Sequence, residues 1–256
     1  MLAGEGPPIK VMAHAHTLFS SDGELSPQEL ADLARGRGFA AVLVADHFES
    51  LTAQRFAELR QLCAGVTGCL VAPGYERSWS GYHVLALGVD RWVDDGDIGA
   101  WATQVRDAGG ITVLAHPSRY RHRVPDGVLA ACDAVEVWNS KFGYDGALAP
   151  NPVAYRLMGS RRFPMCGQDL HGRRHASSVA LQLAQPCATA REIIDCVKHG
   201  AYVMGNGLWQ FDKRLSAPLA SVLALFHHGR RIAVDSAIRM RRLTRTGRRR
   251  NRRRDA

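Results

Sequence analysis

Histidine and carboxylate side chains gather at the ends of predicted strands, and their types suit the binding of divalent metal ions. Eight of them stand at strand ends and one aspartate follows closely, the full set being His14, His16, Asp22, His47, Glu76, His83, His116, Asp169 and His171. Imidazole and carboxylate ligands without cysteine are typical of Zn²⁺, Mn²⁺ or Fe²⁺, and not of Ca²⁺, which prefers all-oxygen sites. The set therefore predicts a cluster of two or three divalent ions.

The spacing of the first pair and the order of the later residues support this interpretation. His14 and His16 lie two positions apart on a predicted strand, so both imidazoles are on the same side and can bind one cation. With 11 histidines in 256 residues, one such pair arises readily by chance, and it gains weight from the series that follows. Because the carboxyl ends of parallel strands meet on one face, we expect the nine side chains to converge.

Strand-like and helix-like segments alternate through about the first 205 residues. The segment after Ser26 is a well-marked helix, because Ser26 is an N-cap, Pro27 occupies the first turn and Glu29 completes a capping box. Further helices are expected over 51–65, 98–110, 151–162 and 189–200, and buried strands lie between them. Seven or so such units predict an α/β fold with a mainly parallel sheet closed into a barrel.

Five motifs in order give the chain a resemblance to a known family. HAHTLFSSDG, ADH, PGYE with YHVLALG, AHPSRY and GQDLH fall between residues 9 and 171. Together they resemble the PHP family, named for polymerase and histidinol phosphatase domains. The resemblance implies a distorted seven-stranded (β/α) barrel with a trinuclear metal site.

The resemblance also implies a role for each ligand. It assigns His14, His16, Glu76 and Asp169 to one metal, and makes Glu76 the bridge to a second metal held by His83 and His116. Asp22, His47 and His171 would hold the third. The chain departs from the family pattern where Ala45 replaces a usual threonine and where Gln168 and Leu170 flank Asp169. These departures leave every ligand position filled.

A phosphate ester is the substrate that such a centre favours. A hydroxide that bridges two divalent ions is nucleophilic near neutral pH, and the ions stabilise charge on phosphoryl oxygens. We expect hydrolysis of a phosphate monoester on a small metabolite or nucleotide. Arg119 and Arg173 are candidate phosphate contacts, and Lys141 and Arg77 are further candidates. The alternatives are a nuclease that trims nucleic-acid ends, a metal-stabilised binding module without turnover, and, more remotely, an amidohydrolase-like enzyme.

Three polar residues near the motifs have open roles. Glu136 and Asn139 stand at another strand end, where Glu136 either supports the fold or contacts a ligand. Asp46 either orients His47 or accepts a backbone hydrogen bond.

Positive charge is concentrated in the last part of the chain. Residues 230–256 contain 12 arginines and two acidic residues, a net charge of +10, whereas the whole chain carries +9 and the remainder therefore −1. We expect a phosphoesterase barrel over 1–207, a helical extension over 208–243 and a disordered basic tail over 244–256. The tail could bind nucleic-acid phosphates or an anionic membrane surface. We favour a solvated extension, because 230–256 contains no aromatic residue on which bases could stack.

Cysteine usage and hydropathy predict the compartment. The six cysteines are scattered without a CxxC pair, which favours reduced thiols over disulfides. No apolar run approaches the ~20 residues of a membrane span, and no secretory signal is evident at the start of the sequence. We expect a cytoplasmic protein.

Overall fold

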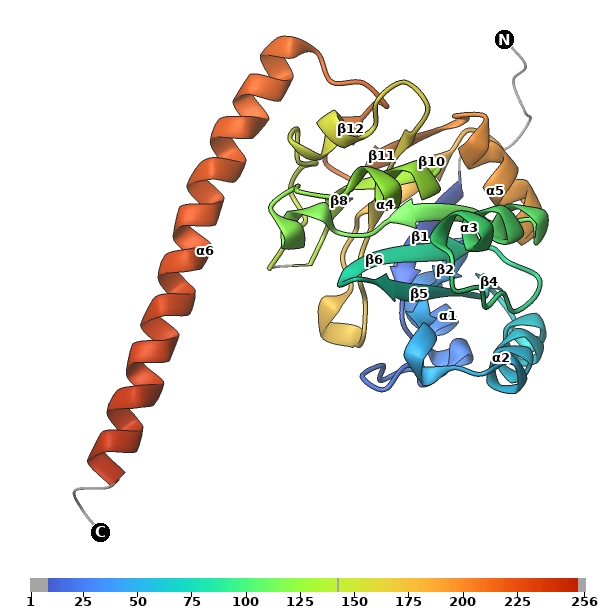
Figure 1. Cartoon of the computed structure of the whole chain (residues 1–256), viewed down its shortest axis with the longest axis horizontal. Helices are drawn as coiled ribbons and strands as arrows, with labels where there is room; N and C mark the ends of the chain where they lie inside the picture. Colours follow the sequence, from blue (N-terminus) through green and yellow to red (C-terminus); the bar gives the residue numbers. More distant parts are fainter. Residues whose placement is uncertain (1–8, 142, 253–256) are drawn as a thin grey trace. The chain divides into compact units, whose positions relative to one another are not determined.

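Two six-stranded sheets form the framework that carries the predicted site. The computed structural model describes residues 9–141 and 143–252, which divide into two units at Leu215 and Ser216. In the first unit one sheet has the order β12-β11-β10-β1-β2-β4 and the other has the order β3-β5-β6-β7-β8-β9. Figure 1 shows the strands in the middle of this unit, with the helices around them.

The strands are short and mostly buried. Their bounds are β1 Ile9–Ala15, β2 Ala41–Val44, β3 Asp46–His47, β4 Leu70–Ala72, β5 Gly74–Trp79, β6 Tyr82–Leu87, β7 Ile111–Leu114, β8 Ala134–Asn139, β9 Phe163–Gly167, β10 Ala180–Leu183, β11 Tyr202–Gly205 and β12 Gln210–Phe211. The two sheets meet beyond the end of β9. Leu170 forms a parallel bridge with Ala15, and its amide donates to the His14 carbonyl at 3.1 Å. This junction brings β1 and the segment after β9 together.

The sheets are mixed, so the expectation of a mainly parallel sheet is wrong. Among the described strand pairs, five are parallel and five are antiparallel. The reason is the length of the connections: β5 and β6 are joined by Ser80 and Gly81 alone, both with positive φ, and so short a turn allows only an antiparallel pair. The α/β class is confirmed, and the closed seven-stranded barrel stays a prediction.

Among the described residues of the first unit, five α-helices lie between the strands along the sequence. They are α1 Pro27–Gly36, α2 Ala53–Gly65, α3 Ile98–Asp107, α4 Asp126–Ala131 and α5 Ala190–Lys198. The capping box predicted for α1 is confirmed: the Ser26 hydroxyl accepts from the Glu29 amide, and the Glu29 carboxylate accepts from the Ser26 amide at 2.9 Å. The helix predicted over 151–162 is wrong. Only one 3₁₀ turn, Ala154–Leu157, forms there.

In its described part the second unit forms one long helix, α6, over Ala217–Arg252. It runs through most of 244–256, so the predicted disorder is corrected to helix as far as Arg252, and 253–256 lie outside the described residues. Arginine is a good helix former and no proline interrupts the segment, which explains the continuation. Within the part of the chain that the structure describes, no helix combines the length and apolar character needed to cross a bilayer.

Candidate metal centre

Side chains from distant segments meet at one place, beside the junction of the two sheets. Three groups of side chains each bring their potential ligand atoms within 4.8 Å of one another. The groups are His16, Asp22, His47 and His171; His14, His16 and Glu76; and Glu76, His83 and His116. Asp169 joins them, since its Oδ1 atom lies 3.5 Å from His16 Nε2 and 3.3 Å from His171 Nδ1. All nine predicted ligands are therefore neighbours.

Glu76 occupies the centre of the cluster and is almost fully buried. Its Oε2 atom faces His14 Nε2 at 3.6 Å, His16 Nε2 at 3.6 Å and His47 Nδ1 at 3.3 Å. Its Oε1 atom faces His83 Nδ1 at 2.6 Å and His116 Nε2 at 3.0 Å. Burial raises the pKa of Glu76, but the surrounding histidines outweigh this effect and hold the pKa well below its usual value. The carboxylate is therefore ionised and presents one oxygen to each group of histidines.

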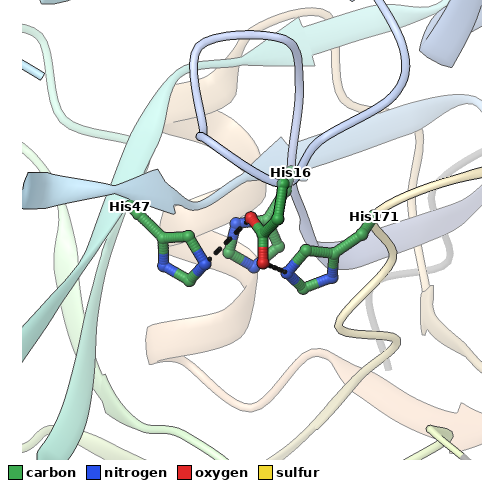
Figure 2. A group of neighbouring side chains, drawn as sticks. His16, His47 and His171 are labelled. Carbon is green, nitrogen blue, oxygen red and sulfur yellow. Dashed lines mark ion pairs between the residues drawn. The ribbon is translucent and has the colours of Figure 1, made fainter. Parts of the chain in front are cut away.

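The third group lies nearer the surface. Figure 2 shows His16, His47 and His171 pointing toward one another from three different segments. Asp22 is more exposed, and its two carboxylate oxygens lie 3.2 Å from His47 Nε2 and 3.2 Å from His171 Nε2. The Asp22 carboxylate thus joins the imidazoles of His47 and His171.

The donor atoms fit a cation. His14 Nε2 and His16 Nε2 are buried and have no hydrogen-bond partner, a costly arrangement for imidazole nitrogens unless a cation binds them. Both face the Glu76 and Asp169 carboxylates at 3.5–3.7 Å. Tetrahedral ligands with bonds of 2.0–2.2 Å would stand about 3.3–3.6 Å apart. The residues present are therefore suited to hold a divalent ion.

Glu136 contacts two of the predicted ligands, which resolves its open role. Its Oε1 atom lies 2.7 Å from His14 Nδ1, and its Oε2 atom accepts hydrogen bonds from the His116 amide at 2.7 Å and from Asn139 Nδ2 at 2.9 Å. A proton held on His14 Nδ1 leaves Nε2 free to bind a metal. Sequence reasoning left this residue undecided because its partners are distant in the chain.

Asp46 supports the opposite side of the cluster. It accepts from the Thr17 amide at 2.6 Å and from the Ser20 hydroxyl at 2.7 Å. The Ser20 oxygen in turn lies 3.1 Å from His16 Nδ1 and accepts from the His47 amide at 2.8 Å. The proposed backbone hydrogen bond to Asp46 is thus confirmed. Ser20, which sequence reasoning did not single out, links Asp46 to two ligands.

Three of the predicted ligands have a strained backbone. His14, His116 and Asp169 have φ of 60°, 31° and 50°, in the left-handed region that side chains other than glycine rarely adopt. Each such residue costs of order 1–3 kcal/mol and persists only where surrounding contacts hold it. The junction with Leu170 and the Glu136 carboxylate provide such contacts for His14 and His116. Strain of this kind is typical of functional sites.

The predicted phosphate contacts differ in where they lie. Lys141 reaches the cluster directly, with Nζ 2.8 Å from Asp169 Oδ2. Arg119 is exposed at its rim and interacts with Tyr144, whose ring centroid lies 4.8 Å from that of His116. Burial raises the pKa of Tyr144 to about 12, an effect that the Arg119 side chain partly offsets, so this phenol is protonated at neutral pH.

Two other arginines have different surroundings. Arg77 packs its guanidinium 4.1 Å from the Phe48 ring centroid and pairs with Asp94 at 3.2 Å. Arg173 is exposed in the 3₁₀ turn Arg173–His175. The pKa of Glu29 is lowered mainly by its hydrogen bonds with Ser26, and the positive charge of Arg173 lowers it further. These contacts therefore favour Lys141 and Arg119 as neighbours of the cluster.

Metal binding should release protons. Burial lowers the pKa of both His14 and His47, but nearby carboxylates outweigh it and raise each above 6.5, chiefly Glu136 for His14 and Glu76 for His47. Protonation of these side chains stabilises the metal-free fold fully below pH 6.5, and this stabilisation is lost as pH rises through the raised pKa values. A cation must displace the same protons, so affinity for Zn²⁺ or Mn²⁺ should rise with pH.

Isothermal titration calorimetry in two buffers with different ionisation enthalpies measures this release. We expect a net release of protons near pH 7 that diminishes as the pH is raised. Binding heats that are independent of the buffer would contradict the assignment of His14 and His47 as ligands.

A comparison with solved structures supports the fold through one of them. A solved two-domain protein from Bacteroides vulgatus, containing a predicted PHP-like metal-dependent phosphoesterase, is 17% identical with a TM-score of 0.58 and aligns over 77% of this chain. The alignment spans 64% of that protein's length, less than two thirds. A candidate metal-dependent phosphoesterase from Bifidobacterium adolescentis is 20% identical with a TM-score of 0.47, over 66% of this chain and 90% of that one.

Comparisons of sequence alone give no match. No family model matches the chain, and no curated protein does. The likeness therefore comes from the arrangement of the elements in space, which agrees with the five ordered motifs. This chain has the fold of a PHP-like protein.

Proposed function

We propose that this chain is a PHP-family hydrolase that cleaves a phosphate monoester of a small metabolite or nucleotide. The observation that carries the proposal is the position of Glu76, whose two oxygens face separate groups of histidines within 3.6 Å. A carboxylate placed in this way is suited to bridge two cations. The fold shared with a predicted PHP-like phosphoesterase supports the same chemistry.

The proposed centre holds two or three divalent ions, of zinc, manganese or iron. One ion would be bound by His14, His16, Glu76 and Asp169, a second by Glu76, His83 and His116, and a third by Asp22, His47 and His171. When bound, such ions lower the pKa of water and stabilise charge that develops on a phosphoryl group. The strands around them would close into the seven-stranded barrel that the family resemblance implies.

The chain's own residues orient this centre and complete the phosphate site. Glu136 and Ser20 fix the rings of His14 and His16, so their free nitrogens point at the same carboxylates. Lys141, which contacts Asp169, is placed to bind a phosphoryl oxygen, and Arg119 lies at the rim beside Tyr144. The positively charged side chains of Lys141 and Arg119, which come from different segments of the chain, would neutralise a dianionic phosphate monoester.

The thiols agree with the compartment proposed for this activity. Every cysteine is free, and five of the six are buried. Free thiols persist in reducing compartments. A cytoplasmic location is therefore part of the proposal.

Phosphate release from a panel of esters tests the proposed function. The panel contains sugar phosphates, nucleoside monophosphates, nucleoside bisphosphates, histidinol phosphate and a 5′-phosphorylated RNA, each with Mn²⁺ or Zn²⁺ and again with chelator. We expect chelator-sensitive hydrolysis of a small ester. Turnover of RNA alone would favour the nuclease, and bound metal that raises the melting temperature without turnover would favour a binding module.

Lys141→Met tests the phosphate contact. The variant removes the positive charge while keeping the length of the side chain. Because a hydrogen bond to a charged group contributes about 1.5–3 kcal/mol, kcat/KM should fall about 10- to 100-fold, mainly through KM. Lys198→Met, at an exposed position in α5, is the matched control. Unchanged kcat/KM with unchanged metal content would exclude Lys141 from phosphate binding.

A further inference from the structure

Helix α6 presents large apolar side chains to solvent. Leu225 is 75% exposed, Val222 63% and Ile232 56%. Leu219 and Phe226, on the same stretch, are each 37% exposed. Exposed apolar residues that are grouped together, rather than scattered singly, are typical of interaction sites.

These side chains share one face of the helix. Successive residues of an α-helix turn by about 100°, which places Val222, Leu225 and Ile232 on one side and Arg231 on the opposite side. Between Ala217 and Ile232 the only residues with a fixed charge are Arg230 and Arg231, and neither interrupts the apolar face. Between Ala217 and Ile232 the helix is therefore amphipathic, with an apolar face that carries no fixed charge.

Positive charge increases along the same segment. Residues 230–256 contain 12 arginines against two acidic residues. A basic amphipathic helix with a charge-free apolar face is typical of segments that lie at a membrane surface.

Three kinds of partner would satisfy these features to different degrees. A nucleic acid would pair with the arginines but leave the apolar face in water. A second copy of the helix would cover the apolar face but bring two segments of charge +10 together. An anionic bilayer accepts the apolar side chains among its acyl chains and the arginines among its headgroups. The bilayer alone matches both features.

We propose that α6 binds the surface of an anionic lipid bilayer and lies along its interface. The helix enters with the face that carries Val222, Leu225 and Ile232, while the arginines contact lipid headgroups. Because α6 does not meet the requirements of a membrane span, binding is peripheral. This proposal is independent of the hydrolase activity, since it rests on the second unit alone.

Co-sedimentation of the full chain with lipid vesicles tests the proposal. Vesicles of phosphatidylcholine are compared with vesicles containing equal parts of phosphatidylcholine and phosphatidylglycerol. We expect binding to the anionic vesicles that weakens as salt is added, because salt screens the arginine charges. Equal binding to both vesicles, or to neither, would overturn the proposal.

Charge-matched variants separate apolar insertion from simple charge attraction. Leu225→Glu and Ile232→Glu each place a carboxylate on the apolar face, and Leu62→Glu places one at a residue of α2 that is 53% exposed. All three change the net charge equally. We expect about a tenfold or greater loss of vesicle affinity for the α6 variants relative to Leu62→Glu. Equal affinities would overturn the proposal.

Two further measurements address the other partners with the same protein. Fluorescence anisotropy with a short RNA, and sedimentation equilibrium without lipid, are carried out on the wild type and Leu225→Glu. We expect the wild type and Leu225→Glu to bind RNA equally weakly, and both proteins to be monomers without lipid. RNA binding tighter than vesicle binding would overturn the proposal in favour of a nucleic acid. Self-association that Leu225→Glu abolishes would overturn it in favour of a second copy of the chain.

Discussion

Glu76→Gln should remove bound metal and lower phosphoesterase turnover by about 1000-fold, equivalent to roughly 4 kcal/mol in the activation barrier. The amide has the shape of the carboxylate but carries no charge. It would leave five histidine nitrogens without the anion that faces them at present. Metal content by mass spectrometry and initial rates on the best ester from the panel measure the two effects.

The matched control for Glu76→Gln is Glu58→Gln, at an exposed position in α2. It makes the same chemical change away from the centre and should retain metal and activity. Circular dichroism shows whether each variant is folded. Wild-type metal content and turnover in folded Glu76→Gln would refute the proposed centre, whatever the substrate.

Gly167→Ala should damage both stability and metal binding. A Cβ atom at this position would stand 1.9 Å from Glu136 Oε1 and 3.0 Å from His14 Cβ. Both neighbours are buried, so the carboxylate has to leave His14 Nδ1. We expect about 1–3 kcal/mol of destabilisation from the added volume and about a 10- to 100-fold loss of metal affinity from the displaced carboxylate.

Gly127→Ala in α4 is the control for this substitution. A Cβ atom there meets nothing within 4 Å, so the free energy of unfolding should be unchanged or slightly raised. The steric origin is tested by adding Gly167→Ala to Glu136→Ala, where the clashing carboxylate is absent. The stability cost of Gly167→Ala should shrink in that background. An equal cost in both backgrounds would place its origin elsewhere than Glu136.

The convergence of the nine candidate ligands could be predicted because their residue types are specific and their positions recur at strand ends. A histidine such as His116 that follows a buried strand has few structural roles that require an imidazole. The capping box of α1 is similarly local, since Ser26 and Glu29 are three residues apart. Short-range patterns of this kind keep their meaning in the folded chain.

The partners of the residues around the cluster could not be predicted in the same way. Glu136 contacts His14 across 122 residues of sequence, and Lys141, a candidate from the sequence, contacts Asp169 across 28. Nothing local specifies such pairs, because they depend on the register of β8 against its neighbours. The direction of strand pairing was missed for a related reason: the two-residue connection at Ser80 decides it, and a regular alternation of strands and helices does not reveal that connection.

The long separation of the ligands along the chain has a consequence for how the protein assembles. His16 and His171 are more than 150 residues apart in sequence, yet their rings stack at 4.0 Å. A cation shared between their segments closes a loop of that length, and so acts on the unfolded ensemble as a cross-link does. During synthesis the complete set of ligands cannot form until the segment after β9 has emerged. Loading of the proposed centre would therefore require the chain at least as far as His171, and an N-terminal fragment lacking that segment would have no complete set of predicted ligands.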